Sequence, residues 1–287
     1  MLRWLVAHAI RNTSQQAVQD VAKDAVRTAQ DSTRQVLPLE VESFPPVDAL
    51  VLFALSVESS PFIAKLETPR RFRWEKTKGV IGKLGERYVA VLHTGVGTSA
   101  AGKLVEKIGP ALPSESNWIS SGFAGGLVPE LKRGDLLMAN TVTDGKRSVA
   151  LTRRIGQDAV DATPYLHSGT LFTTDHIVAS GEERAALAEQ HGAVACDMES
   201  MEIADRLERL GRSLTSVRII SDSVEDEIPT EVSKLLSQST LASKVGAATG
   251  ALFQRPSAAK DMWKHRDHAG RTAERLAGFL TGIVEQV

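Results

Sequence analysis

The feature that most constrains the fold is an alternation of short apolar runs with helical segments, which begins at Asp48. Short apolar runs bounded by turn residues are typical of strands in a central sheet, and the segments between them suit covering helices. Strands are expected over residues 49–55, 80–83, 88–93, 117–125, 135–144, 168–178, 193–199 and 213–223. Helices are expected over residues 61–67, 99–109, 181–192, 200–211, 230–242 and 268–284. The pattern predicts an α/β fold, a three-layer αβα sandwich whose sheet is mixed because a hairpin turns near Gly85.

The composition indicates a folded chain and excludes several functional classes. Hydrophobic residues make up 42% of the 287 residues, and no apolar run reaches the roughly 18–20 residues of a membrane-spanning helix. Basic residues number 34 against 35 acidic ones, so the net charge gives no reason to expect nucleic acid as a partner. The single cysteine cannot form an internal disulfide, and the histidines lack metal-ligand spacing. We therefore expect a cytoplasmic protein without a metal or another cofactor.

Residues 1–47 form a predicted N-terminal helical extension that differs from the domain expected over residues 48–287. The segment contains no glycine, and its apolar residues recur at helical spacing over 17–29. Pro45 and Pro46 then end any helix and act as a linker. The favoured interpretation is a helix packed on the domain or on another subunit. The alternative is peripheral contact with a membrane, since aromatic and basic residues are mixed near the start.

Acidic residues and glycine-rich turns follow several of the predicted strands. In open α/β sheets, ligands bind beyond the carboxyl ends of the strands. The features at these positions are Glu58, Asp197, Glu199 and Asp222, with turns at 94–98 and 122–126. Their distribution predicts a small-molecule site that contains acid and base groups.

Each of these features alone also has a purely structural interpretation. Glycines at strand–helix turns commonly serve the turn itself, and the glycines of residues 94–102 lack the placement of a dinucleotide-binding fingerprint. Glu58 and Glu199 suit helix N-termini, where the helix dipole stabilises a carboxylate, and Asp222 suits an N-cap. The functional hypothesis therefore depends on their occurrence together.

Five motifs in order carry a resemblance to a known family. They are ALSVE (54–58), HTGVGTSAA (93–101), SGFAGGLVPELKRGDLLMA (121–139), DMES (197–200) and VRIISDS (217–223). Over residues 48–229 the chain resembles the nucleoside phosphorylase/nucleosidase superfamily. It is similar to the methylthioadenosine/S-adenosylhomocysteine nucleosidases and to the hopanoid-associated phosphorylase-like branch. The resemblance implies the phosphorylase/hydrolase-like fold, a nucleoside substrate and a homo-oligomer.

The resemblance assigns three carboxylates to the cleavage of a purine N-ribosidic bond. Asp222 matches the acid that protonates the leaving base at N7, a task that requires a raised pKa and a partly desolvated position. Glu199 matches the carboxylate that holds the ribose hydroxyls, since an acceptor-only group suits a diol. Glu58 matches the base that orients and deprotonates the attacking water.

Further residues match the walls of the substrate site. Thr94 matches a small hydroxyl residue at the ribosyl face, and the turn amides from Gly95 onward suit an anion or the nucleophile. Met198 matches an apolar wall for the sugar or base.

The wall expected around the base departs from the family pattern. Ile177 stands where the nucleosidases carry the phenylalanine that stacks on adenine, and the backbone of Val178 matches the group that pairs with the purine edge. Phe123 or Phe172 is an alternative stacking residue. The preference for adenine therefore follows from the resemblance and not from a visible aromatic residue.

The nucleophile is expected to be water, with phosphate as the alternative. Phosphorolysis needs cationic donors at the ribosyl carbon, and the anionic Glu58 disfavours a phosphate dianion. The candidate arginines, for which solvent exposure is the favoured interpretation, are Arg147, Arg153, Arg154 and Arg184. The function predicted is hydrolysis of a 5′-modified adenosine. The alternatives are a phosphorylase, including one for a lipid-linked nucleoside, and a non-catalytic nucleoside-binding protein.

Overall fold

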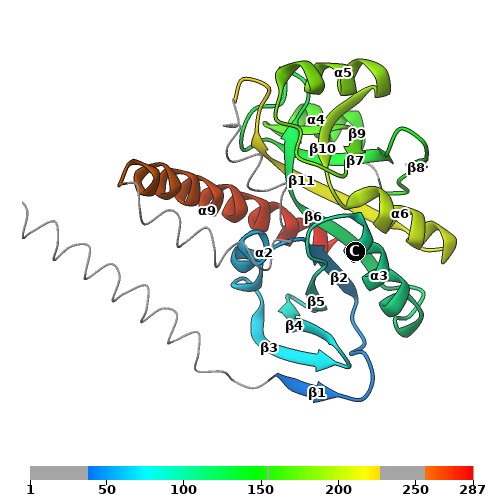
Figure 1. The fold of residues 1–287 in the computed structure, drawn as a ribbon. Coiled ribbons are helices and arrows are strands. Elements are labelled where there is room, and N and C mark those ends of the chain that lie inside the picture. Colours follow the sequence, from blue (N-terminus) through cyan, green and yellow to red (C-terminus); the bar gives the residue numbers. More distant parts are fainter. Residues whose placement is uncertain (1–37, 154, 227–255, 287) are drawn as a thin grey trace, which may run out of the picture. The chain divides into compact units, whose positions relative to one another are not determined.

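The computed structural model describes residues 38–153, 155–226 and 256–286 (Figure 1). Contacts divide the chain into two compact units, Met1–Leu39 and Glu40–Val287. The elements are β1 (Leu39–Val41), β2 (Ala49–Phe53), α2 (Ser56–Ile63), β3 (Glu67–Trp74), β4 (Thr77–Leu84), β5 (Arg87–His93), α3 (Thr98–Ile108), the short 3-10 helix η1 (Gly109–Ala111), β6 (Asn117–Gly126), β7 (Leu136–Thr143), β8 (Ser148–Ala150), α4 (Gln157–Ala162), β9 (Leu166–Thr173), α5 (Gly181–His191), β10 (Ala193–Asp197), α6 (Ser200–Arg209), β11 (Leu214–Asp222) and α9 (Pro256–Glu285). The helix expected over 230–242 and the helix expected in the N-terminal extension lie outside the described residues.

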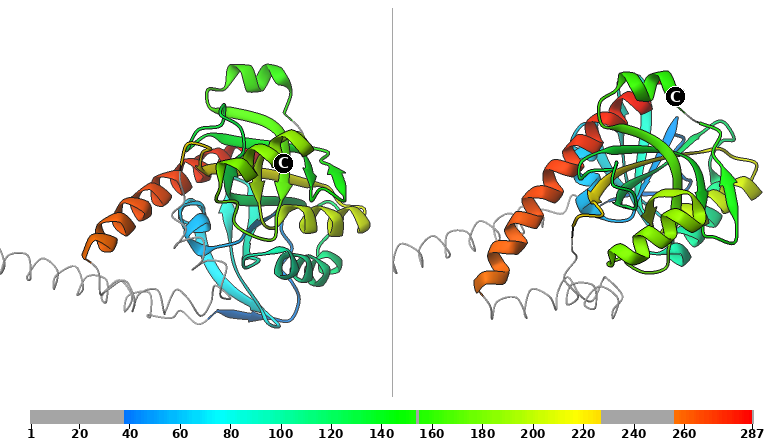
Figure 2. Two further views of the ribbon diagram at one scale, coloured as in Figure 1. Left: turned by 45° about the horizontal axis from the view of Figure 1, so that its top comes forward. Right: turned by 90° about the horizontal axis from the view of Figure 1, so that it is seen from above.

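Helices cover both faces of the sheet, as the side chains of β2 illustrate. Leu50 and Leu52 point into an apolar cluster that includes residues of α3 and α6. Val51 and Phe53 point to the opposite face, into a cluster that includes residues of α2 and α9. Figure 2 shows α9 beside α2, on which it packs. The predicted α/β class with a mixed sheet is confirmed.

Part of the sheet closes into a ring, whereas the sheet of a simple three-layer sandwich is open. Its strands follow the order β1-β3-β4-β5-β2-β6-β10-β9-β7-β11, with β8 beside β7. Because β11 also pairs with β6, the strands from β6 to β11 in this order form a closed ring. The predicted architecture did not specify this closure, because apolar runs identify strands but do not show which strands pair.

The pairing of the strands brings two distant segments to the same stretch of β6. β2 is parallel to β6, with Leu52 opposite Ser120, so the chain after β2 emerges near the middle of β6. β10 is antiparallel to β6, with Cys196 opposite Gly125, so the residues after β10 run back toward the same stretch. The helices α2 and α6 therefore both begin beside β6.

Two elements differ from the expectation between β2 and β4. α2 begins at Ser56 instead of Pro61, because the side chain of Glu58 accepts the N–H of Leu55 and caps the helix start. Pro61 lies inside the helix. The strand β3 was not expected, because most of its residues are exposed and it lacks an apolar run.

Residues 40–47, which the sequence places in the extension, pack with the larger unit. The side chains of Phe44 and Val47 are buried in the cluster shared with α3 and α6. Phe44 contacts the rings of Phe72 and Trp74 edge-on, with centroids 5.5 Å apart in both cases. The compact unit thus begins at Glu40, before the predicted boundary at residue 47.

Candidate active site

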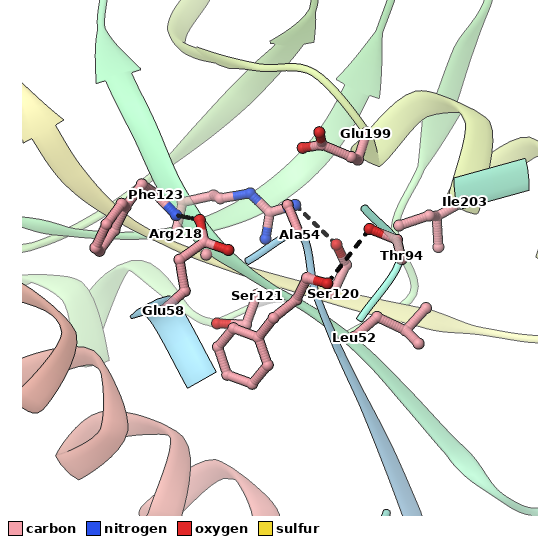
Figure 3. Close-up of a pocket in the computed structure, with 12 residues that line it drawn as sticks. Leu52, Ala54, Glu58, Thr94, Ser120, Ser121, Phe123, Glu199, Ile203 and Arg218 are labelled. Atoms are coloured by element: carbon pink, nitrogen blue, oxygen red, sulfur yellow. Dashed lines mark hydrogen bonds between the residues drawn. The ribbon is translucent and has the colours of Figure 1, made fainter. Parts of the chain in front are cut away.

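A small cavity lies where the carboxyl ends of β2 and β5 meet the middle of β6 (Figure 3). Its volume is about 10 Å³, which is the space of a single water molecule. The lining residues are Leu52, Phe53, Ala54, Glu58, Thr94, Ser120, Ser121, Gly122, Phe123, Glu199, Ile203 and Arg218. Four of the predicted site residues, Glu58, Thr94, Phe123 and Glu199, are therefore brought together here.

Glu58 is fixed in the cavity by the first turn of α2. Its Oε2 accepts the N–H of Leu55 at 2.8 Å, and its Oε1 accepts the N–H of Phe123 at 2.9 Å. Gly122 allows this approach, since a Cβ there would lie 2.8 Å from Oε1 and its φ is +150°. The carboxyl group is buried and has one fixed orientation.

Burial makes Glu58 a stronger base than an ordinary glutamate. Desolvation raises its pKa, while the amide bonds from Phe123 and Leu55 and the charge of Arg218 act in the opposite direction. A carboxylate whose pKa is raised accepts a proton more readily near neutral pH. Its position and its basicity thus suit the activation of a water molecule in the cavity.

Glu199 faces the cavity from the position that precedes α6. Its Oε1 accepts the N–H of Gly97, the residue before α3, at 2.7 Å. Burial, with the nearby charge of Asp197, raises the pKa of Glu199 to about 7. The group therefore changes between acid and carboxylate near neutral pH, and only the carboxylate accepts two hydroxyl donors.

Arg218 is a site residue that the sequence analysis missed. Its buried guanidinium donates to Asp197 Oδ2 at 2.8 Å and to Ser120 Oγ at 2.7 Å. Figure 3 shows the guanidinium between the carboxyl groups of Glu58 and Glu199, and its charge offsets part of the rise in pKa that burial causes in both. The available signal was a single cation inside the apolar run VRIIS, where a buried charge requires a partner.

The hydroxyl of Thr94 and the two phenylalanines occupy different surroundings. Thr94 Oγ1 donates to the carbonyl of Gly95 at 2.7 Å, at the edge of the cavity. Phe123 supplies its N–H to Glu58, and its ring packs against the cluster shared with α2 and α9. Phe172 stacks on the ring of His191, with centroids 4.7 Å apart.

The remaining predicted residues do not line this cavity. Asp222 pairs with Gly125, three positions beyond Gly122 on β6, which is about 10 Å along the strand. The other residues outside the lining are Gly95, Ile177, Val178 and Met198. Val178 is buried in a separate apolar cluster with Phe172. The structure therefore brings Glu58, the predicted catalytic base, together with Glu199, the predicted ligand of the ribose. It leaves Asp222, the predicted acid, farther along the sheet.

Asp222 is paired with Arg184, and this corrects the expectation of a solvent-exposed Arg184. The guanidinium is 1% exposed, and its Nη2 donates to Asp222 Oδ2 at 2.5 Å. Asp222 Oδ1 accepts the hydroxyl of Ser221 at 2.6 Å, so both carboxylate oxygens are engaged. Of the other arginines considered, Arg147 pairs with carboxylates, and Arg153 donates to the side-chain oxygen of Asn117. Arg154 lies outside the described residues.

A second and larger cavity lies at the carboxyl ends of β7 and β9. Its volume is about 390 Å³, within the range of small-molecule sites. It is lined by Thr98, Asp144, Lys146, Arg147, Phe172, Thr173, Thr174, Asp175, His176, Glu183, Leu187, Met201 and Glu202. Two of its lining residues, Thr98 and Met201, follow closely after Gly97 and Glu199 in the chain.

The described residues contain neither a metal-binding cluster nor a membrane-spanning helix. No group of three or more His, Cys, Asp or Glu side chains among them is arranged to hold a metal ion. No helix in the described part of the chain is both long and apolar enough to cross a membrane. Burial raises the pKa of Cys196, which adjoins the Asp222–Arg184 pair, to about 12, so its thiol is neutral at ordinary pH.

Comparisons with known proteins agree with the motifs. The family model described as Phosphorylase superfamily matches residues 146–253. No curated protein matches the sequence. The match and the fold together confirm the superfamily resemblance found in the sequence.

Solved structures with the same fold include several nucleosidases. A Helicobacter pylori futalosine hydrolase mutant is 16% identical, with 83% of this chain and 99% of that chain covered and a TM-score of 0.61. A mutant 5′-methylthioadenosine/S-adenosylhomocysteine nucleosidase of the same organism, with 5′-methylthioadenosine in its active site, is 17% identical, with 85% and 100% covered and a TM-score of 0.62. The Streptococcus pyogenes S-adenosylhomocysteine nucleosidase is 17% identical, with 69% and 92% covered and a TM-score of 0.54. At these identities the likeness concerns the fold.

Proposed function

We propose that this chain, a member of the phosphorylase superfamily, is a purine nucleosidase that hydrolyses the N-glycosidic bond of a 5′-modified adenosine. In this reaction, water attacks C1′, the bond from C1′ to N9 breaks, and adenine and a ribose derivative are released. The water loses a proton to Glu58, and the base gains a proton at N7 from Asp222. The proposal extends to this chain the substrate class named for its structural neighbours.

The observation that carries the proposal is the cavity between Glu58, Glu199 and Arg218. Its volume of about 10 Å³ suits one water molecule, and the buried Glu58 is oriented toward it by two backbone amides. Glu199 adjoins the same space, so a ribose held by this carboxylate would have its anomeric carbon near the water. This arrangement supports activation of water beside a bound ribose.

The charges around the cavity favour water over phosphate as the nucleophile. Arg218 is the one cation among the described residues that line it, and Asp197 already neutralises that cation through a buried ion pair. Glu58 and Glu199 would repel a phosphate dianion at the same place. We therefore prefer hydrolysis to phosphorolysis, which stays the alternative for the same fold.

The leaving base depends on Asp222, which lies beyond the cavity lining. About 24% of its side chain is exposed, so it can take up a proton from solvent between turnovers. Asp222 lies opposite Gly125, which is three residues beyond Gly122 on β6, a separation of about 10 Å that the base of a bound nucleoside would bridge. Adenine would then leave as a neutral molecule, which lowers the barrier to cleavage.

The test is incubation of the full chain with 5′-methylthioadenosine, S-adenosylhomocysteine and 5′-deoxyadenosine, each with and without phosphate. Release of adenine without phosphate is the expected result. Strict dependence on phosphate would replace hydrolysis by phosphorolysis. Asp222→Asn is expected to lose most of the turnover while it still binds the nucleoside.

A non-catalytic nucleoside-binding protein is the second candidate. The observation that favours it is that Asp222 does not line the cavity that holds Glu58 and Glu199. Calorimetric binding of the three nucleosides without release of adenine would support this candidate.

A further inference from the structure

The first turn of α5 carries two neighbouring side chains that bind different parts of the predicted base-binding region. Arg184 reaches inward to Asp222, and Glu183 reaches to His176 in the loop that follows β9. The helix start is fixed by Ser180, whose Oγ accepts the N–H of Glu183 at 3.1 Å. Both contacts therefore originate from one well-defined helical turn.

The contacts of Arg184 fix the end of β11 against the end of β6. Its Nη1 donates to the carbonyls of Gly126 and Ser223, at 3.0 Å and 3.1 Å. Its Nη2 donates to Asp222 Oδ2 at 2.5 Å. A buried guanidinium is costly unless its donors are satisfied, and here they meet the residue after Asp222 as well as Asp222 itself. The orientation of this carboxyl group is thus set by α5.

The contacts of His176 fix the loop that carries the predicted base wall. Its Nε2 lies 2.6 Å from Glu183 Oε1, and its Nδ1 lies 2.7 Å from Asp175 Oδ1. The start of the loop is anchored by the N–H of Thr174, which donates to the carbonyl of Asp197 at 2.8 Å. Ile177 and Val178 follow immediately, so their placement depends on both attachments.

We propose that the first turn of α5 is a clamp that positions Asp222 through Arg184 and the base-wall loop through the Glu183–His176 contact. The clamp rests on the proposed function, because it acts on the residues assigned to the leaving base. Arg184 and His176 are positioning residues in it, and the proton donor is Asp222.

The charge of Arg184 distinguishes this role from simple packing. A buried apolar side chain of similar volume would fill the space at lower cost, because an ion pair gains little over apolar packing once desolvation is included. Arg184 is 1% exposed while 24% of its partner Asp222 is exposed, so the fixed member lies inside and the carboxyl group faces outward. This geometry suits a carboxyl group that must meet a ligand in one orientation.

The kinetic test measures adenine release from 5′-methylthioadenosine by the full chain. Arg184→Met is expected to lower kcat roughly 100-fold with KM changed by less than about threefold, because Asp222 is no longer held in the orientation that delivers its proton while the ribose contacts remain. Arg184→Lys is expected to stay within about tenfold of wild type, since it retains a cation near Asp222. The matched control is Arg212→Met, which removes donors to the carbonyls of Leu112 and Pro113 away from the site and should leave kcat unchanged.

A double variant keeps the test valid if Arg184→Met does not fold. Arg184→Met combined with Asp222→Asn removes both charges and leaves no unpaired ion. If Arg184 acts through Asp222, the double variant and Asp222→Asn alone should have the same kcat. A further loss of more than about tenfold in the double variant would overturn the proposal.

The Glu183–His176 contact is tested by His176→Gln, with His167→Gln as the control. His167 also pairs with a carboxylate, Asp135 at 3.0 Å, but lies outside both cavity linings. His176→Gln is expected to raise KM about fivefold with kcat within about twofold, because the base wall loses one attachment. An unchanged KM contradicts the clamp.

The outcomes separate the clamp from the proposed function. A wild-type chain that releases no adenine from any of the three nucleosides defeats the proposed function, and the clamp with it. An active wild type with an equally active Arg184→Met defeats the clamp alone.

Discussion

In the proposed reaction, the carboxyl group of Glu199 accepts hydrogen bonds from the ribose hydroxyls, although its buried surroundings disfavour the charged form. Burial and Asp197 raise its pKa to about 7, so the carboxylate form is gained as the pH rises through this value. Only that form accepts both hydroxyl donors of a diol. We therefore expect kcat/KM for 5′-methylthioadenosine to rise between pH 6 and pH 8, as measured by adenine release. A profile that is flat or falling over this range would contradict the assignment.

The same raised pKa predicts a stabilising substitution at Glu199. A carboxyl group whose folded pKa exceeds its unfolded value favours the folded state at low pH, and this contribution is lost as pH rises through the folded pKa. Glu199→Gln, which stays neutral, is expected to raise the free energy of unfolding at pH 8 by roughly 1–3 kcal/mol and to abolish most activity. Denaturant unfolding of both proteins at pH 5 and pH 8 measures the difference in their free energies of unfolding. The stabilisation by Glu199→Gln should be much smaller at pH 5 than at pH 8.

Gly122 supplies the backbone geometry that Glu58 requires. A Cβ at this position would lie 2.8 Å from Glu58 Oε1, and the φ of +150° is unfavourable for alanine. Gly122→Ala is expected to cost about 1–3 kcal/mol of stability and to lower kcat at least roughly tenfold, because the carboxylate must move. Gly156→Ala is the control, since nothing lies within 4 Å of the added atom. Equal effects of the two substitutions on kcat would argue against a role for Glu58.

At the scale of elements, the sequence predicts what each segment becomes better than where it lies. β2 was predicted from a continuous apolar run, and β6 and β11 were predicted from segments that also contain polar residues; the structure buries most residues of all three strands. The ring formed by β11 on β6 was not predicted, because it depends on pairing between segments distant in sequence. The strand β3 escaped prediction because its residues are largely exposed.

The same distinction applies to the site. Glu58 and Glu199 were placed correctly at strand ends, and antiparallel pairing of β10 with β6 explains why they meet. Arg218 was missed, and Arg184 was expected to be exposed. A buried cation can be predicted only when its acidic partner is known, and the partners Asp197 and Asp222 are distant in sequence. The match of Asp222 to the family acid is a motif argument that the cavity lining does not reproduce.

The attachment of the β9–α5 loop is expected to depend on pH. Hydrogen bonds to Asp175, the larger cause, and to Glu183 raise the pKa of His176 above its ordinary value of 6.5. The stabilisation from these ion pairs is therefore fully present when the pH is below 6.5, and it is lost as the pH rises through the raised pKa. The nearby charge of Lys146 also lowers the pKa of Asp175, which keeps this carboxyl group ionised. His176→Gln should therefore lower Tm at pH 6 and have little effect at pH 8.5, by thermal melting. The same loss at both pH values would mean that the histidine charge is not involved.

At the scale of the whole molecule, the boundary of the compact unit decides how much of the N-terminal region the domain needs. Contacts separate Met1–Leu39 from Glu40–Val287, whereas the sequence places the boundary at residue 47. The residues between the two boundaries include the last two residues of β1 and the buried side chains of Phe44 and Val47. The structure therefore predicts that the stable domain requires these residues.

Two shortened chains test this boundary. A chain that starts at Pro38 is expected to keep the free energy of unfolding and the adenine release of the full chain, because it retains β1 and both buried side chains. A chain that starts at Asp48 is expected to lose about 3–5 kcal/mol, because Phe72 and Trp74 lose the ring of Phe44 and a cavity is left. Denaturant unfolding of the three chains measures the difference. Equal free energies of unfolding for the two shortened chains would favour the boundary at residue 47. A lower free energy of unfolding for the chain that starts at Pro38 than for the full chain would show that the domain depends on residues before Pro38.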